Sequence, residues 1–308
     1  MASRLRWVLA CLVACVLPPA WGDGTVQLIA SEEGGAYLEA ADAFRAAFGA
    51  AHPLRSWSLA QLDGAQLRAL SGEHDLIVAI GLRAARTLAY HYGGQAAVLT
   101  LMLPRASAER LLWPVGVPRR KVSHVYIDQP ASRTLGLVAA AFPQARRVAL
   151  VVSAENAEAV KALQQDAVRR HLSLNLNTVA QADDVAPALR EVLPDSDVLL
   201  LLPDSIAIHA GNVQNVLLTT YRYRVPVVGF SHGLSRAGAV AAVYSSPAQI
   251  GRQGGLMALH WKPENGDLPA SRDSDAFSVV FNPQVARSLG VILPDLAQVR
   301  KLLGAEED

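Results

Sequence analysis

The chain has 308 residues, of which 51% are apolar, and its 28 basic and 27 acidic residues leave a formal net charge of +1. A chain of this length and apolar content can bury a large core and holds about two domains, which excludes a disordered chain. Because the charges are balanced and spread along the chain, the basic surface of a nucleic-acid-binding protein is missing, and we expect no nucleic acid among its partners.

The N-terminus predicts a secretory signal peptide over residues 1–22. Two arginines precede an uncharged apolar run at 7–20, and small residues stand just before Asp23. The run is shorter than the roughly 20 apolar residues of a membrane-spanning helix, and no later segment reaches that length without a charge or a helix breaker. We therefore expect a protein exported to the periplasm.

Both cysteines, Cys11 and Cys15, lie inside the predicted signal peptide. Cleavage after Gly22 leaves a mature chain without a thiol, so we expect no disulfide and no cysteine-ligated metal. One alternative stays open, because the sequence LVAC ending at Cys15 resembles the lipobox of bacterial lipoproteins and would give a lipid anchor there. The histidines show no metal-ligand spacing such as H-E-x-x-H, and we expect no cofactor.

Beyond residue 23, apolar runs of strand length alternate with helical patterns, which is typical of a mostly parallel sheet covered by helices. The near-continuous apolar strands indicate that both faces of the sheet are buried. The expected elements, in chain order, are strand 26–30, helices 36–48 and 59–71, strand 75–80, helix 83–91, strands 97–101 and 122–127, helix 133–141, strand 148–152, helix 156–171, strand 172–179, helix 185–193, strand 198–202, helix 206–221, strands 225–229 and 239–244, helix 247–261 and strand 277–281.

Ten strands are many for one sheet, and the chain has natural seams between them. One predicted domain boundary lies at Asp128-Gln129-Pro130 and another near 245–247. The charged stretch 262–275 is expected to be an exposed segment before the last strand. The fold we expect is α/β with two doubly wound lobes that close by hinge bending. Their predicted extents are 23–128 plus 246–274 for the first lobe and 129–245 plus 275–308 for the second.

The most informative stretch is VPVVGFSHGLSRAGAVAAVYSSPAQIGRQGG, residues 225–255. Two short apolar strands each end in polar residues, and Pro247 suits the first turn of a helix. Ligands of open α/β sheets bind outside the carboxyl ends of the strands. The sequence therefore predicts that Phe230, Ser231 and Tyr244 line a ligand cleft.

The same stretch contains a match to G-x-S-x-G, the nucleophile turn of α/β-hydrolases, centred on Ser231. That fold needs an acid and then a histidine downstream of the serine. No aspartate or glutamate lies between Ser231 and His260, the last histidine. We therefore expect that the protein is not an enzyme. A secreted hydrolase is kept as a minor alternative.

Three motifs together resemble a known family. They are LLLLPDSIAI at 199–208, the stretch 225–255, and FSVVFNPQVARSLGVILP at 277–294. In order and spacing they are similar to those of the extracytoplasmic substrate-binding proteins of ABC importers, in the subgroup that includes binders of aromatic amino acids. The resemblance implies the type I periplasmic binding protein fold, with two Rossmann-like lobes joined by three crossings and a ligand in the cleft between them. It also implies an ABC permease in the inner membrane as partner.

The resemblance assigns ligand-contact positions in both lobes. Helix N-terminal amides in the first loop would stabilise an anionic ligand group. The chain departs from the family where Leu82-Arg83 replaces a small hydroxyl residue and where Asp204-Ser205 replaces an Asp-Asn pair. The resemblance therefore does not imply that the ligand is an amino acid. The full set of predicted ligand residues is Ser31, Glu32, Gly35, Gly81, Asp128, Gln129, Asp204, Phe230, Ser231 and Tyr244.

We thus expect the solute-binding component of an ABC importer, which binds a small polar or amphipathic molecule, with amino acids among the candidates. The alternative is a periplasmic sensory or accessory protein that uses the same fold to act on a signalling or outer-membrane receptor partner, without transport. The sequence does not separate these two functions.

Overall fold

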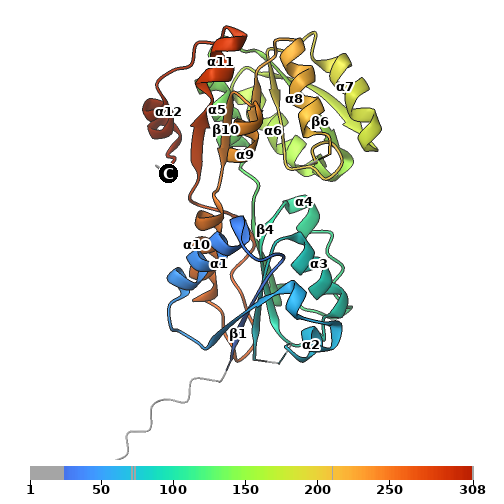
Figure 1. The fold of residues 1–308 in the computed structure, drawn as a ribbon, viewed down its shortest axis with the longest axis vertical. Helices are drawn as coiled ribbons and strands as arrows, with labels where there is room; N and C mark the ends of the chain where they lie inside the picture. Colours follow the sequence, from blue (N-terminus) through green and yellow to red (C-terminus); the bar gives the residue numbers. More distant parts are fainter. Residues whose placement is uncertain (1–23, 71, 73, 210, 307–308) are drawn as a thin grey trace, which may run out of the picture.

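The structure, a computed structural model, describes residues 24–70, 72, 74–209 and 211–306. The predicted signal peptide and both cysteines lie outside them. The described chain forms two α/β lobes stacked along the long axis of the molecule (Figure 1). This confirms the predicted fold class. None of the helices in the described chain is long and apolar enough to cross a membrane.

Each lobe is built on a six-stranded sheet. In the first lobe the order is β11-β5-β4-β3-β1-β2 and all pairs are parallel. In the second it is β12-β10-β9-β8-β6-β7, and only β12 is antiparallel to its neighbour. The strands are β1 (Val26–Ala30), β2 (Leu54–Ser58), β3 (Leu76–Ile80), β4 (Ala97–Leu103), β5 (Val122–Tyr126), β6 (Arg147–Ser153), β7 (Ser173–Val179), β8 (Val198–Leu200), β9 (Val227–Gly229), β10 (Ala241–Tyr244), β11 (Arg272–Asp273) and β12 (Ser278–Phe281).

Helices cover both faces of each sheet. In the first lobe α1 and α10 lie on one face and α3 on the other, and in the second lobe α7 and α8 lie opposite α5 and α6 (Figure 1). The helices are α1 (Gly35–Phe48), α2 (Gly64–Ala69), α3 (Leu82–His91), α4 (Arg105–Ala108), α5 (Ala131–Ala141), α6 (Ala157–Arg169), α7 (Val185–Val192), α8 (Val213–Arg222), α9 (His232–Ala237), α10 (Pro247–Ala258), α11 (Pro283–Leu289) and α12 (Leu296–Leu303).

The continuous apolar strands follow from this double cover. In β3, Leu76, Val78 and Ile80 pack toward α1 and α10, whereas Ile77 and Ala79 pack toward α3. Successive side chains of a strand point to opposite faces, so a strand buried on both sides must be apolar at every position. Burial of such a side chain stabilises the fold by about 1.5–3 kcal/mol.

The chain passes between the lobes three times, after β5, after β10 and after β11. Hydrogen bonds tie the three crossings together. Gln129 Nε2 donates to Ser245 Oγ at 2.9 Å, and Ser245 Oγ donates to the carbonyl of Ala276 at 2.8 Å. The guanidinium of Arg133 donates to Gln129 Oε1 and to the carbonyls of residues 274 and 275. The three crossings are therefore connected at one place, while hinge bending and the predicted lobe boundaries stay predictions.

Two predicted helices are wrong at their starts. The helix predicted over 206–221 begins only at Val213, because Asp204 and Asn212 hold the intervening residues in turns through side-chain bonds to the backbone. The helix predicted over 59–71 is a 3₁₀ turn followed by α2. The reason is a new start at Asp63, whose carboxylate accepts from the amides of Ala65 and Gln66.

Candidate functional site

A cavity of about 410 Å³ lies between the lobes, beside the first crossing. It is lined from the first lobe by Arg105 and Glu109, from the second lobe by the start of α6 and the residues after β8 and β9, and by the crossing segments themselves. These are carboxyl ends of strands and N-terminal turns of helices, as expected for a ligand site in a doubly wound sheet. The cavity has the size of a small-molecule site.

The structure brings three of the predicted ligand residues to this cavity, namely Asp128, Gln129 and Phe230. Phe230 is half-buried and follows β9, whereas Asp128 and Gln129 follow β5 at the first crossing. Both amide atoms of Gln129 are hydrogen-bonded within the hinge, to Ser245 and Arg133. Phe230 and Asp128 are thus the predicted residues best placed to meet a ligand.

Arg105 is the basic residue of the cavity lining, and it begins α4, two residues after the end of β4. Its guanidinium is 2.7 Å from Asp273 Oδ1 and 3.7 Å from Glu109 Oε1. The same guanidinium lies 4.0 Å above the ring of Tyr126. Arg105 is therefore held in place by three partners of its own lobe.

Asp128 sits against this arginine without forming an ion pair with it. Its Oδ2 accepts the backbone N–H of Arg105 at 2.7 Å. Burial raises the pKa of Asp128 to about 6, an effect that the Arg105 amide opposes and the neighbouring Asp273 carboxylate reinforces. The cavity therefore contains a carboxylate whose charged form is destabilised until a cation approaches it.

Asp204 has a different environment from the one the resemblance implied. Its Oδ2 accepts from the amide of Ser153 and from Asn156 Nδ2, each at 2.7 Å. Its Oδ1 accepts from the amides of Ile206 and Ala207. The side chain is buried, and its neighbour Pro203 faces the cavity. Asp204 thus joins the end of β6 to the turn after β8, and a ligand contact stays a prediction.

The residues predicted in the first lobe lie at the ends of β1 and β3. Ser31 Oγ donates to the carbonyl of Ile80 and accepts from the amide of Ala84, so it links the two strand ends to the start of α3. Gly81 has φ +90°, and a Cβ there would lie 2.6 Å from Ser31 Oγ, which requires glycine.

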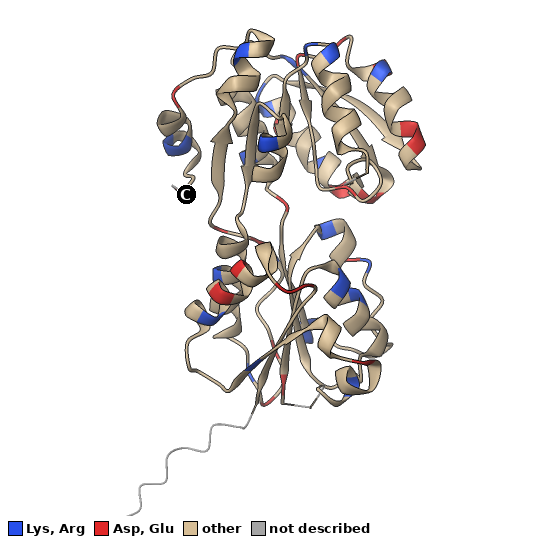
Figure 2. Cartoon of the chain, in the orientation of Figure 1, with Lys and Arg blue, Asp and Glu red and all other residues tan. Residues whose placement is uncertain are grey.

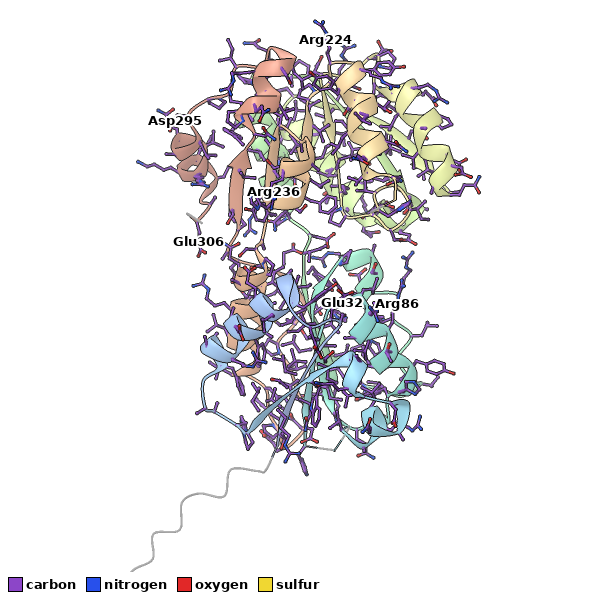
Figure 3. All side chains as sticks on the ribbon, viewed as in Figure 1. Glu32, Arg86, Arg224, Arg236, Asp295 and Glu306 are labelled. Carbon is purple, nitrogen blue, oxygen red and sulfur yellow. The ribbon has the colours of Figure 1, made fainter. Side chains whose placement is uncertain are left out.

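Glu32 lies in the loop after β1 and Gly35 is the first residue of α1, and both are exposed. Glu32 pairs with Arg83 at 3.2 Å, and it lies on the side of the first lobe that faces the second (Figure 3). The cavity lining includes neither of them, nor Ser31 or Gly81. A ligand contact by these four residues stays a prediction that requires the lobes to approach further.

Ser231 and Tyr244 lie in the second lobe. Ser231 caps α9, because its Oγ accepts from the amide of Leu234 at 3.1 Å. Tyr244 ends β10 and is 7% exposed, with its ring 6.1 Å from the imidazole of His232. The cavity reaches their neighbours, Phe230 and Val243.

The sequence prediction found Asp128 but missed the other four charged residues of the lining, Arg105, Glu109, Glu158 and Asp273. Arg105 follows an apolar strand, so the rule that selected Phe230 would have found it. Asp273 lies in β11, a strand of two residues that carries no apolar pattern of its own. Only tertiary pairing with β5 brings it to the cavity.

Arg252 of α10 and Glu306 of the second lobe form an ion pair at 2.9 Å, and a further ion pair joins the lobes beside the cavity. Arg110, just after α4, pairs with Glu155 in the short 3₁₀ turn Ala154–Asn156, and Ser205 Oγ donates to the same carboxylate at 2.9 Å. The bond from Arg110 outweighs partial burial and lowers the pKa of Glu155. The pair stabilises the lobe arrangement of this structure.

We expect Glu155→Gln to weaken that arrangement by about 1 kcal/mol, the scale of a partly exposed ion pair. Small-angle scattering of the ligand-free protein should then give a larger radius of gyration. Asp42→Asn, which removes an ion pair with Arg45 inside the first lobe, is the matched control. Equal scattering curves for Glu155→Gln and wild type would contradict a bracing role for this pair.

Within the described chain, no group of three or more histidine, cysteine, aspartate or glutamate residues could hold a metal ion. The two sheets, the three crossings and the cavity between them define the class of two-lobed α/β binding proteins. The chain belongs to the family of ABC transporter substrate binding proteins, which matches residues 60–301. This confirms the resemblance seen in the sequence.

Solved structures show the same fold at low sequence identity. A conserved domain protein from Vibrio cholerae is 18% identical with a TM-score of 0.62, covering 90% of this chain and 98% of its own. An ABC domain in complex with L-Trp, from Streptococcus pneumonia, is 16% identical with a TM-score of 0.62, at 92% and 99% coverage. A ligand-free, open substrate binding protein with adhesive properties from Clostridium difficile is 18% identical with a TM-score of 0.66, at 88% and 96% coverage. Among curated protein sequences there is no match.

Proposed function

We propose that this protein is the solute-binding component of an ABC importer, which captures a small polar or amphipathic molecule in the cavity between its lobes. Export to the periplasm and delivery to a permease in the inner membrane belong to the same proposal. The observation that carries it is the cavity of about 410 Å³, where charged groups from both lobes and the ring of Phe230 converge beside a hydrogen-bonded hinge. Such a mixture suits a ligand with one charged and one apolar part.

Amino acids are one candidate class, because the pneumococcal structure with the same fold holds L-Trp. The proposal includes no catalysis. Ser231, the serine of the G-x-S-x-G match, has its Oγ bonded to a backbone amide at the start of α9 rather than to an imidazole. That capping bond suits a structural serine.

A blocked cavity tests the proposal. Ala159 lies on α6 and lines the cavity, so Ala159→Trp should fill the space that a ligand needs. A thermal-shift screen of wild type against amino acids, amines, organic acids and purines should give hits, since a ligand at about a hundred times its Kd stabilises by about 2.7 kcal/mol. We expect Ala159→Trp to lose every hit.

The control is Ala157→Trp, which places the same side chain on an exposed position of α6 outside the cavity. It should keep the hits. Hits that survive Ala159→Trp would place binding elsewhere and contradict the proposal. A well-folded wild type without any hit would also count against it and favour the accessory role, in which the fold contacts a protein partner.

A further inference from the structure

The cavity lining is strongly acidic. Its single basic residue, Arg105, faces four carboxylates, those of Glu109, Asp128, Glu158 and Asp273. Figure 2 shows acidic segments on the chain between the lobes as well as on the lobe surfaces that face each other. A cavity with excess negative charge attracts cations and repels anions, most of all where burial lowers the dielectric constant.

The arginine does not offset this charge for a ligand. Its guanidinium is bonded to Asp273 at 2.7 Å and stacked 4.0 Å above Tyr126. Arg133, the nearest other cation of the hinge, donates to two backbone carbonyls and lies over the ring of Phe277 at 4.2 Å. The charge of Arg105 is thus already paired with Asp273, and an incoming carboxylate would compete with Asp273 for this guanidinium.

Asp128 and Glu158 are the carboxylates left for a ligand. Neither takes part in an ion pair within the described parts of the chain. Asp128 accepts the Arg105 amide on Oδ2, and burial raises its pKa to about 6. Glu158 lies in the first turn of α6, where its negative charge interacts favourably with the positive end of the helix dipole. This helix end therefore offers little to an anionic ligand.

From this geometry, and resting on the proposed function, we infer that the cavity binds organic cations. The ligand is a primary amine whose ammonium group lies between Asp128 of the first crossing and Glu158 of the second lobe. Its apolar part packs against Phe230 and Leu202. An α-carboxylate is not required, because the one basic residue of the lining, Arg105, is already paired with Asp273. This extends the proposed function by naming the charge of its ligand.

Binding of such a cation also links the first crossing to the second lobe. Asp128 belongs to the first crossing and Glu158 to α6, so one ammonium group would bridge two parts of the hinge-bending unit. A ligand held by both carboxylates would then favour the arrangement in which Asp128 and Glu158 line one cavity. The ammonium group of the ligand also stabilises the charged form of Asp128, which burial destabilises.

The test compares ligands that share an apolar part and differ in charge. Tryptamine, tryptophan and indole-3-propionate form one series, and phenethylamine, phenylalanine and 3-phenylpropionate form a second. Calorimetry on the mature chain should give the amines at least the affinity of the amino acids, and the acids should bind on the order of 100-fold more weakly than the amines. Tighter binding by the acids, or no binding by either amine, would overturn the inference.

Variants separate this inference from the proposed function. Asp128→Asn keeps an oxygen to accept the Arg105 amide but removes the charge, so amine affinity should fall on the order of 100-fold. Glu158→Gln, on an exposed helix turn, should also lower the amine affinity. It provides the same test if Asp128→Asn fails to fold. The control Asp183→Asn removes an exposed carboxylate far from the cavity lining and should change nothing.

The pH profile gives a readout that a purely structural role would not move. The groups facing Asp128 are Arg105 and Asp273, with Glu109 and Glu158 on the further walls. Wild-type amine affinity should fall as the pH drops below about 6, where Asp128 takes up a proton, and Asp128→Asn should flatten that part of the profile. A hit among anions in the wider screen, lost in Ala159→Trp, would refute the cation inference and leave the proposed function standing. A screen without hits would refute both.

Discussion

Asp204→Ala is expected to lower the free energy of unfolding by about 4 kcal/mol, a larger loss than for other single carboxylates of the second lobe. The carboxylate is 5% exposed and accepts four hydrogen bonds, from Ser153 N, Asn156 Nδ2, Ile206 N and Ala207 N, all between 2.7 and 2.9 Å. Its removal leaves several buried donors without an acceptor, and each such donor costs about 1–3 kcal/mol. Thermal or urea unfolding measures the loss.

The loss should depend on pH. Burial alone would raise the pKa of Asp204, but the amides of Ala207, Ser153 and Ile206 and the amide of Asn156 outweigh it and lower the pKa. A carboxylate with a lowered folded pKa stabilises the protein above its unfolded pKa of about 4 and loses that effect as the pH falls through the folded value. The difference between wild type and Asp204→Ala should therefore be full at pH 7 and shrink in strong acid.

Ser205→Ala is the matched control, because Ser205 is exposed and donates only to Glu155. It should change the stability by less than about 1 kcal/mol. If Asp204→Ala unfolds like wild type yet loses ligand binding, Asp204 does not stabilise the junction of β6 with the turn after β8. It then contacts the ligand, as the family resemblance implied.

The strands were predictable because burial on both faces leaves a signal in the sequence. All ten predicted strands exist, with ends shifted by up to two residues, since a run such as Leu76–Ile80 has no polar interruption. The two missed strands are edge strands. In β2 the residues Arg55 and Ser56 are exposed, and β11 has two residues. An edge strand is covered less, so its sequence need not be apolar.

The site was predictable only in part, because strand ends can be located from sequence whereas hydrogen-bond partners cannot. The strand-end rule found Phe230, and the seam found Asp128. Nothing in the sequence shows that the Asp204 carboxylate accepts four hydrogen bonds within its own lobe, since three of the four donors are backbone amides. The pairing of Arg105 with Asp273 spans 168 positions of the chain, which local patterns do not reach.

Gly251→Ala should destabilise the first lobe by about 3 kcal/mol or more, although alanine is the better helix former. Helices α1 and α10 touch through their backbones at this glycine. A Cβ on Gly251 would lie 2.1 Å from the carbonyl oxygen of Ala40 and 2.9 Å from its Cα. Backbone atoms in the middle of a helix do not move aside, so α10 has to shift as a whole.

The matched control is Gly233→Ala in α9, where a Cβ would meet nothing closer than Ser231 Oγ at 3.7 Å. The same substitution there should be neutral or stabilise by about 0.5–1 kcal/mol, through lower entropy of the unfolded chain. Chemical unfolding of both variants gives the comparison. A harmless Gly251→Ala would mean that α10 has freedom to slide over α1. Because α10 begins directly after the second crossing and β11 leads into the third, that freedom would make the helix itself part of the hinge rather than a fixed layer of the first lobe.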